Sequence, residues 1–379
     1  MEEHKGLNGV TVVDSIKKRD KFLDFPYSHY DGDDCYVPPL RMDQKKLIDT
    51  QKNPFFNNAD IELYLAEKDG EIVGRIAAIE NYAFNRYHNT KTGFFGFFEC
   101  INDPATAKLL FRVAKDWLRS RGLDTLLGPA SPGMMDTVGV LVDGFDVLPS
   151  ILMPYNKSYY DSLLKKCGLS KEVDLYNYWV KDTGVDIERL NRGKKIIERR
   201  YPTFKLRKVN MKDIENEGER IRYIFNEAWA DNWGFVPVTK EEFSHMIDDL
   251  KLIVDPEYVY LVEVEGKTVG FNIALPDWNR ALYYLKDGRL LPTGIFKLLY
   301  HKKEINRVRT ALMGLLPEYR GTGFDAMMHR ESTLQCLESD KYEGSEIGWI
   351  LETNTPMIRV AEGVNGELEK TYRMYSSPL

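Results

Sequence analysis

A four-residue turn, Arg320-Gly321-Thr322-Gly323, has the residue types that bind an anion such as the pyrophosphate of a coenzyme. Glycines let the backbone approach a phosphate because no Cβ stands in the way. Unpaired N–H groups at the start of a helix point at such a ligand, and Arg320 adds a permanent positive charge. In isolation, the same four residues are also typical of an ordinary connection between a strand and a helix.

The flanking residues supply the elements that such an anion site needs. Residues 309–316 are predicted to form a buried strand, and residues 324–339 are predicted to form a helix. A strand, a glycine turn and a helix start therefore follow one another directly. The helix is indicated by apolar residues that recur at the helical period, namely Phe324, Met327, Met328, Leu334 and Leu337.

An internal repeat relates the two halves of the chain. Residues 63–79 match residues 259–275 at an offset of 196 residues. Each segment is predicted to be a hairpin, because an acidic residue followed by Gly joins two β-rich runs. The identical pairs are Tyr64/Tyr260, Leu65/Leu261, Glu67/Glu263, Gly70/Gly266, Val73/Val269, Gly74/Gly270 and Ala78/Ala274.

A second match lies farther along the chain. Asn156 and Gly168 correspond to Asn354 and Gly366 at an offset of 198 residues, with a helical stretch inside each pair. We therefore predict two similar domains, 1–184 and 185–379.

Each half carries extra chain at a different place. The second half inserts residues 276–307, which include an amphipathic helix near 294–300. The first half inserts residues 129–150, which are rich in Gly, Pro and Met and are predicted to be a long, functional loop.

The first half differs from the second where the anion site would lie. A strand over residues 94–101 leads into Asp103 and Pro104, and a helix follows as far as Ser120. Asp103 suits the N-cap of this helix, and Pro104 suits its first position. The carboxylate fills the anion site and the proline removes one donor, so we expect the first half not to bind a coenzyme in this way.

The second half resembles the GNAT acyl-CoA N-acyltransferases. Their motif A reads R/Q-x-x-G-x-G/A, often with R-G-x-G inside it, and residues 318–323 keep the R-G-x-G part. Glu318 stands where the family has Arg or Gln, and Asp325 places another carboxylate beside the expected anion. The segment from Asn354 to Tyr375 is similar to the closing helix and strands of the family.

This resemblance covers about residues 205–379, and the repeat extends it to the first half. It implies an α/β fold with a mixed sheet, built as two tandem GNAT-like domains of which the first is degenerate at the coenzyme site. The implied cosubstrate is acetyl-CoA or another acyl-CoA, whose pantetheine arm would pair with backbone between splayed strands. The implied coenzyme-binding residues are Leu315, Leu316, Arg320, Gly321, Thr322, Gly323, Phe324 and Asn354.

GNAT chemistry requires a base for the amine and an acid for the departing thiolate. Glu352 follows the predicted strand 347–351 and is the candidate base, although a solvent-facing carboxylate at a strand end would look the same. Glu346 is a weaker candidate of the same type. Tyr372 is the candidate acid, with packing as the alternative, because the family's frequent acid Tyr is replaced here by Ala361.

The acceptor side is expected near residues 225–235, where four large aromatic residues gather. The resemblance implies that this region is the helix–loop–helix that shapes the acceptor pocket, and core packing is the equal alternative. Asn232 and Trp233 are the candidate substrate contacts. None of the six histidines has a catalytic spacing, and His329 is expected to be exposed or packed.

Composition argues against other classes of protein. The 379 residues suit two domains, and the net charge of −6 argues against a general nucleic-acid binder. The four cysteines form no CxxC pair, so neither a disulfide framework nor a metal site is predicted. The N-terminus has no apolar signal, and no apolar run approaches the ~18 residues of a membrane span. We expect a cytoplasmic protein without membrane or nucleic-acid partners; the oligomeric state is not predicted.

The resulting hypothesis is an acyl-CoA-dependent N-acyltransferase, with acetyl-CoA as the expected donor and an unidentified small amine as the acceptor. The amine would attack the thioester directly. Two alternatives stay open, namely a non-catalytic coenzyme or metabolite binder and an aminoacyl-tRNA-dependent transferase of a related tandem fold.

Overall fold

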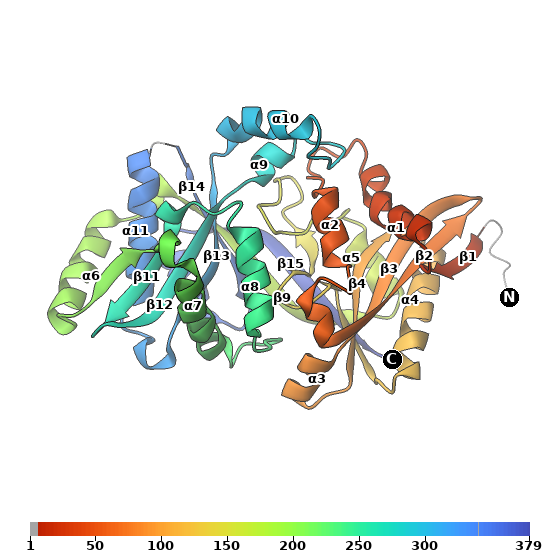
Figure 1. Cartoon of the computed structure of the whole chain (residues 1–379), viewed down its shortest axis with the longest axis horizontal. Coiled ribbons are helices and arrows are strands. Elements are labelled where there is room, and N and C mark those ends of the chain that lie inside the picture. The colour runs from red at the N-terminus through yellow and green to blue at the C-terminus, as the bar shows by residue number, and fades with distance from the viewer. Residues whose placement is uncertain (1–6, 340) are drawn as a thin grey trace. The chain divides into compact units, whose positions relative to one another are not determined.

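A computed structural model describes residues 7–339 and 341–379, which divide into two compact units (Figure 1). The first unit contains the chain up to residue 175 together with residues 282–300 and 370–379. The second unit contains residues 176–281 and 301–369. The last strand of the chain thus belongs to the first unit, and part of the last strand of the first half belongs to the second.

The strands of the first unit follow the order β1-β2-β3-β4-β5-β15, and β8 also pairs with β15. Among the described residues of this unit, β4 and β5 run parallel, and the pairs β1–β2, β2–β3, β3–β4, β5–β15 and β8–β15 are antiparallel. The strands are β1 (Leu7–Val12), β2 (Ala59–Lys68), β3 (Glu71–Asn81), β4 (Thr92–Cys100), β5 (Thr125–Gly128), β8 (Val140–Asp143) and β15 (Glu367–Pro378). The helices are α1 (Ile16–His29), α2 (Arg41–Leu47), α3 (Tyr82–His88), α4 (Pro104–Ser120) and α5 (Tyr160–Lys166), with α10 (Gly294–His301) added from the second half.

The second unit repeats this arrangement, with the strand order β9-β14-β13-β12-β11-β10. Its parallel pair is β13 and β14, and β10 to β13 are antiparallel neighbours. The strands are β9 (Ser170–Lys181), β10 (Lys205–Lys208), β11 (Val259–Val264), β12 (Lys267–Pro276), β13 (Val308–Leu315) and β14 (Gly344–Leu351). The helices are α6 (Ile187–Arg200), α7 (Ile214–Trp229), α8 (Lys240–Leu250), α9 (Asn279–Leu282), α11 (Phe324–Ser339) and α12 (Thr355–Gly363).

The two predicted hairpins are confirmed as β2–β3 and β11–β12. Their turns place Asp69-Gly70 at φ 51° and 86°, and Glu265-Gly266 at φ 53° and 77°. Two successive positive φ values match the twist of a two-residue hairpin, which is why Gly stands second in both turns. In each half an antiparallel hairpin is followed by a third antiparallel strand and then by a parallel one, which confirms the α/β fold with a mixed sheet.

Helices α7 and α11 cover opposite faces of the second sheet, as two neighbouring residues of β12 demonstrate. Asn272 donates from Nδ2 to Ser332 Oγ on α11, at 3.1 Å. Phe271 points the other way, since a Cβ at Gly314 would touch both its ring and Ala228 on α7. Successive strand side chains alternate between faces, so the two faces of β13 and β14 can be described separately.

The inserted segment 129–150 is not the long loop that its composition predicted. It contains the short strands β6 (Ala130–Ser131) and β7 (Thr137–Val138), which pair with each other, and then β8. β8 depends on a distant partner, β15, which local composition does not reveal. The domain boundary near residue 185 stays a prediction. The compact units do not divide the chain there, because part of β9 belongs to the second unit and most of β15 belongs to the first; we call β9 and β15 the exchanged strands. Within the described ranges, no helix combines the length and apolar character that crossing a membrane requires.

Candidate active site

The loop between β13 and α11 has the open backbone that an anion site requires. Gly321 and Gly323 adopt φ values of 72° and 86°, in the region that favours glycine. Thr322 folds back on the loop, donating from Oγ1 to the Tyr319 carbonyl at 2.7 Å. No protein acceptor is found for the N–H groups of Gly321, Gly323 and Asp325 in the described part of the chain. These amides are therefore available to a ligand.

Arg320 connects this loop to the end of α7. Its guanidinium donates to the Ala228 carbonyl at 2.7 Å and lies 3.8 Å from the Asp231 carboxylate. The Arg320 side chain is 49% exposed and the Asp231 side chain 88%, so this ion pair contributes little to stability. The cation can therefore exchange its present partners for a phosphate at low cost.

Strands β13 and β14 separate after three paired positions, namely Val308 with Ser345, Arg309 with Glu346 and Thr310 with Ile347. Beyond Thr310, β13 stays paired with β12 as far as Leu315, with a bulge opposite Ile273 and Ala274. The backbone edge of β13 that faces away from β12 is thus released from β14 near the loop of residues 317–323. The predicted coenzyme contacts Leu315 and Leu316 lie at the end of this edge.

The side chain of Phe324, another predicted coenzyme contact, belongs to the core. It is fully buried and packs against the rings of Tyr201, Phe204 and Tyr319. Only the backbone of Phe324 faces the loop, where its N–H lies 3.4 Å from Thr322 Oγ1. By packing in the core, its aromatic ring holds the first turn of α11 next to the glycine loop.

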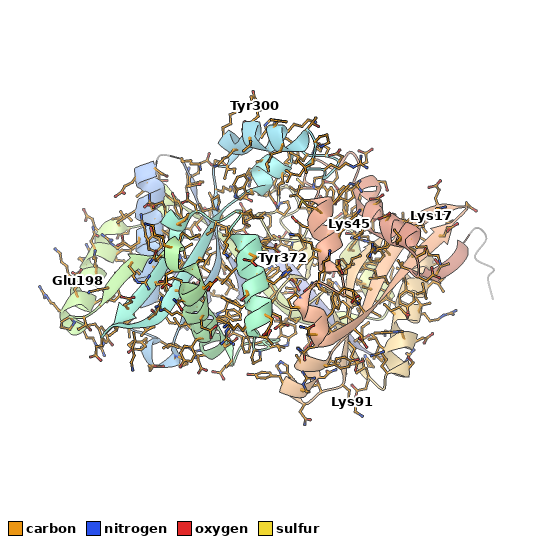
Figure 2. The ribbon with its side chains drawn as sticks, in the orientation of Figure 1. Lys17, Lys45, Lys91, Glu198, Tyr300 and Tyr372 are labelled. Atoms are coloured by element: carbon orange, nitrogen blue, oxygen red, sulfur yellow. The ribbon has the colours of Figure 1, made fainter. Side chains whose placement is uncertain are left out.

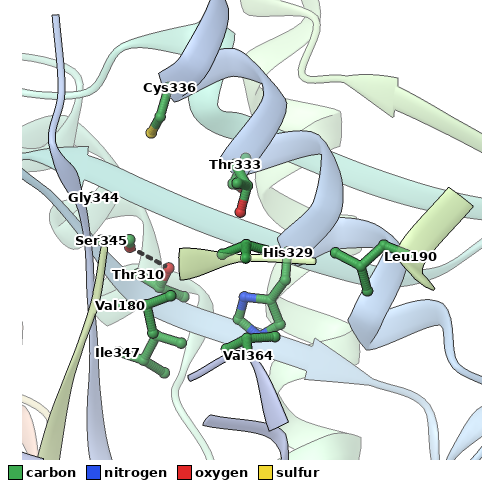
Figure 3. A pocket seen from close by; sticks show the side chains of 12 residues that line it. Val180, Leu190, Thr310, His329, Thr333, Cys336, Gly344, Ser345, Ile347 and Val364 are labelled. Carbon is green, nitrogen blue, oxygen red and sulfur yellow. Dashed lines mark hydrogen bonds between the residues drawn. The ribbon is translucent and has the colours of Figure 1, made fainter. Parts of the chain in front are cut away.

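A pocket opens on the α11 face where the two strands begin to separate (Figure 3). His329 reaches into it from α11, with its side chain 6% exposed and Nε2 without a hydrogen-bond partner within the described residues. Burial lowers the pKa of His329, although Asp325 opposes the shift, so the imidazole is neutral at neutral pH. The apolar part of the lining comes from Val180, Val185, Leu190, Ile347 and Val364. Of the two sequence alternatives, an exposed or a packed His329, the structure shows the packed one, and its position beside a pocket was not predicted.

The opposite face of the same strands carries a buried polar group. Glu346 is fully buried, accepts from Asn177 Nδ2 at 2.7 Å, and lies 3.9 Å from Arg309 Nε. Nearby, Trp229 at the end of α7 donates from Nε1 to the Met313 carbonyl at 3.2 Å. This face therefore combines a carboxylate at the point of strand separation with the aromatic end of α7.

The two predicted catalytic residues lie in different units. Glu352 follows β14 in the second unit and is half-buried. Tyr372 is fully buried on β15 in the first unit, where it pairs with Leu141 of β8. The catalytic role of Tyr372 therefore stays a prediction from the sequence. Of the two glutamates, Glu346, the weaker sequence candidate, is fully buried, whereas Glu352 is half-buried.

The remaining predicted site residues lie at the ends of helices. Asn354 caps α12 by accepting from Met357 N–H at 3.3 Å, which leaves its amide nitrogen for a coenzyme contact. Asn232 and Trp233 follow α7 in a turn closed by the Asn232 N–H and the Trp229 carbonyl, and both are half-buried. Arg320 links the predicted acceptor segment to the phosphate loop through Ala228, so these two parts of the site are brought together.

The corresponding opening in the first unit is occupied by the chain itself. Strands β4 and β5 also separate after three pairs, ending at Phe94 with Leu127. There the β6 residue Ser131 accepts the Phe97 N–H at 2.8 Å, and Gly96 lies so close to the Ala130 carbonyl that a Cβ would collide with it. This packing supports the expectation that the first half does not take a coenzyme between its strands.

The predicted cap of α4 is confirmed. Asp103 accepts from Ala105 N–H at 3.0 Å and from Thr106 Oγ1 at 2.7 Å, and Pro104 occupies the first helical position. We expect Asp103→Ala to cost about 1 kcal/mol of folding free energy, which lowers the melting temperature by about 2–4 °C. Asp103→Asn should keep the cap. A loss of melting temperature with Asn equal to that with Ala would show that the cap is not the cause.

A buried cluster in the first unit was not foreseen from the sequence. The Glu99 carboxylate accepts from the hydroxyls of Tyr30 and Tyr160, each at 2.6 Å, and burial raises its pKa although Arg75 opposes the shift. Burial also lowers the pKa of His29 to about 4, so a neutral imidazole meets the Tyr160 hydroxyl at 3.0 Å. The cluster ties α1 and α5 to β4, and its members are too far apart in sequence to form a motif.

Comparison with solved structures defines the class of fold. A tandem GNAT protein from the clavulanic acid biosynthesis pathway covers 98% of this chain and 97% of its own, with a TM-score of 0.55 and 10% identity. A probable N-acyltransferase from Enterococcus faecalis V583 covers 97% of this chain and 72% of its own, with a TM-score of 0.52 and 9% identity. At these identities the likeness concerns the fold, and the chain has the tandem fold of the GCN5-related N-acyltransferases. No model of a known protein family matches the chain.

Sequence comparison identifies the family. Protein YghO of Escherichia coli (strain K12) is 34% identical over 364 residues, which cover 94% of this chain and 92% of that protein. The bacterial ceramide synthase of Caulobacter vibrioides (strain NA1000 / CB15N) is 34% identical over 367 residues, covering 95% and 94%. The chain belongs to the family that contains these two proteins.

Proposed function

We propose that this chain is an acyl-CoA-dependent N-acyltransferase with its active site in the second unit. The observation that carries the proposal is the separation of β13 and β14, which joins a glycine-rich anion loop at one end to a pocket at the other. Leu315 and Leu316 would present backbone to the pantetheine arm, and the loop amides with Arg320 would hold the pyrophosphate. The first unit, with its opening filled, would support and shape the enzyme.

The reaction requires an unprotonated amine and a place for the proton. The amine nitrogen attacks the thioester carbonyl, a C–N bond forms, and the C–S bond breaks to release the coenzyme thiolate. The amine gives up a proton to a base, and the thiolate finally takes one to become the thiol. Glu346 and Glu352 are the candidate bases, of which Glu346 is favoured by its burial where the strands separate.

The lining of the pocket, rather than its volume of about 20 Å³, supports a donor with an apolar acyl chain as well as acetyl-CoA, and a longer chain would have to push the side chains apart. The pocket starts at Thr310 and Ile347, where a thioester lying along β13 would end, and five of its twelve lining residues are aliphatic. A longer acyl chain would bury apolar surface of its own and of the aliphatic lining, and burial of apolar surface favours binding. For the acceptor, the name of the ceramide synthase relative supports the primary amine of a long-chain amino alcohol.

The test combines binding with turnover. We would measure the melting temperature with acetyl-, octanoyl- and palmitoyl-CoA, and then thiol release with a long-chain amino alcohol and with short amines as acceptors. We expect stabilisation by an acyl-CoA and thiol release with at least one amine. Stabilisation without thiol release would favour a non-catalytic binder, and no stabilisation by any acyl-CoA would refute the coenzyme site.

The pocket predicts a chain-length effect. Thr333 lines it from α11, and Thr333→Phe should raise KM for palmitoyl-CoA by about tenfold, because overpacking costs about 1–3 kcal/mol. Acetyl-CoA should be little affected. Leu337→Phe, at a 40% exposed position on the same helix, is the matched control. Equal effects of Thr333→Phe on both donors would argue against an acyl chain in this pocket.

A further inference from the structure

A group of large apolar side chains is exposed on the inserted segment of residues 282–300. Figure 2 shows Tyr300 projecting away from the ribbon of α10. Burying such side chains is the main favourable term in folding, so a cluster left in water marks a surface that is covered in use. The exposed members are Tyr284 (39%), Leu291 (72%), Phe296 (71%), Leu299 (58%) and Tyr300 (66%).

Helix α10 is apolar on both its inner and its outer side. Gly294 is buried, and Ile295 and Leu298 are half-buried on the inner side. Phe296 and Leu299 are exposed on the outer side. A surface helix of a water-soluble protein normally carries polar residues outside, so the outer face of α10 fits an apolar environment.

The segment is held firmly by the rest of the first unit. Arg41 donates its backbone N–H to the Gly288 carbonyl at 2.9 Å and its Nε to the Asp287 carbonyl at 2.7 Å. Gly288 adopts φ 64° and approaches the Pro39 carbonyl so closely that a Cβ would lie 2.5 Å from it. Residues 287 and 288, which precede α10, are therefore anchored at the start of α2.

The segment that carries the exposed apolar residues also carries a net positive charge. Lys286, Arg289 and Lys297 are exposed in this segment, and Asp287 is the one acidic residue between 282 and 300. The local charge is 3 − 1 = +2, whereas the whole chain carries −6. Aromatic and aliphatic side chains among basic residues are the composition of helices that lie in the interface of an anionic bilayer.

We propose that residues 282–300 bind the surface of a membrane containing anionic lipids, with Phe296, Leu299 and Tyr300 entering the headgroup region. A second copy of this chain fits less well, because a two-fold contact would bring the same basic residues against each other. The sequence-based expectation of no membrane partner concerned spanning segments, and surface attachment needs none. The proposal does not depend on the enzymatic function.

The test is flotation of the full chain with vesicles of phosphatidylcholine alone and of phosphatidylcholine with phosphatidylglycerol, without coenzyme or amine. We expect flotation with the anionic vesicles, weakened by high salt as charge attraction requires. The double variant Phe296→Glu/Leu299→Glu should bind at least about tenfold more weakly. Leu252→Glu is the matched control, since Leu252 is 76% exposed on the second unit.

The outcomes separate the possible occupants of this face. Failure of the wild-type chain to float, or equal flotation of the double variant and the wild type, overturns the proposal. A concentration-dependent dimer that the double variant abolishes, without vesicle binding, assigns the face to a second copy instead. If the double variant keeps the melting temperature of the wild type, it is folded. If it also keeps the response to acyl-CoA, its loss of vesicle binding is independent of the proposed coenzyme site.

Discussion

Gly323→Asp is expected to abolish the stabilisation that an acyl-CoA gives to the wild-type chain. The variant places a carboxylate among the free amides of the anion loop, and it forces a side chain onto a backbone with φ 86°. Loss of charge-assisted hydrogen bonds, with repulsion added, should weaken binding by about 2–4 kcal/mol, or roughly 30- to 1,000-fold. The measurement is the melting temperature as a function of acyl-CoA concentration.

The hairpin of the first half supplies a control for backbone strain. Gly70 has the same φ of 86°, and like Gly323 it precedes a regular element, but it lies in the turn between β2 and β3. Gly70→Asp should lower the melting temperature and leave the response to acyl-CoA intact. If Gly323→Asp kept the full response, the coenzyme would have to bind elsewhere.

Glu346→Gln is expected to lower kcat by about 10²- to 10⁴-fold, the usual contribution of a general base. Gln keeps the shape of the side chain but cannot accept the proton of the amine. The variant also removes the carboxylate that lies 3.9 Å from the buried Arg309, and breaking a buried ion pair costs about 3–5 kcal/mol of stability. Rates should therefore be measured well below the melting temperature, with the acyl-CoA response as evidence of an intact donor site.

Glu352→Gln discriminates between the two candidate bases. Glu352 is half-buried in the turn after β14, and we expect a change in kcat of less than about threefold if Glu346 is the base. Asn177→Ala removes the hydrogen bond to Glu346 without leaving a charge unpaired, so it tests the same site if Glu346→Gln does not fold. A large loss with Glu352→Gln and none with Glu346→Gln would reverse the assignment.

Structural features that depend on residues adjacent in the sequence were predictable from the sequence. The turns at Asp69-Gly70 and Glu265-Gly266, the cap at Asp103 and the glycine loop each depend on a few consecutive residues whose backbone preferences agree. The repeat then provided the comparison that distinguished Gly323 from Asp103 at equivalent positions. These local features predicted the hairpins and the loop, because hairpins and helix starts are local structures, and the fold class followed from the resemblance to the GNAT family.

The clusters that bring chemistry to the site were not predictable in the same way. Glu346 meets Arg309 and Asn177 only after three strands pair, and His329 faces a pocket because α11 packs on one particular face. A single sequence carries no signal for such distant partners, since each residue taken alone is typical of a strand or a helix. The placement of Tyr372 in the first unit has the same cause, because the destination of the last strand is set by long-range pairing.

The exchanged strands also govern how this protein can be made. Strand β15 is made after β5 and β8, yet it pairs with both and belongs mostly to their unit. The nascent first unit must therefore keep a sheet edge unpaired until β15 has been synthesised. Expression of residues 1–184 alone should accordingly yield an aggregation-prone fragment, and supplying a 370–379 peptide is the direct way to look for its rescue.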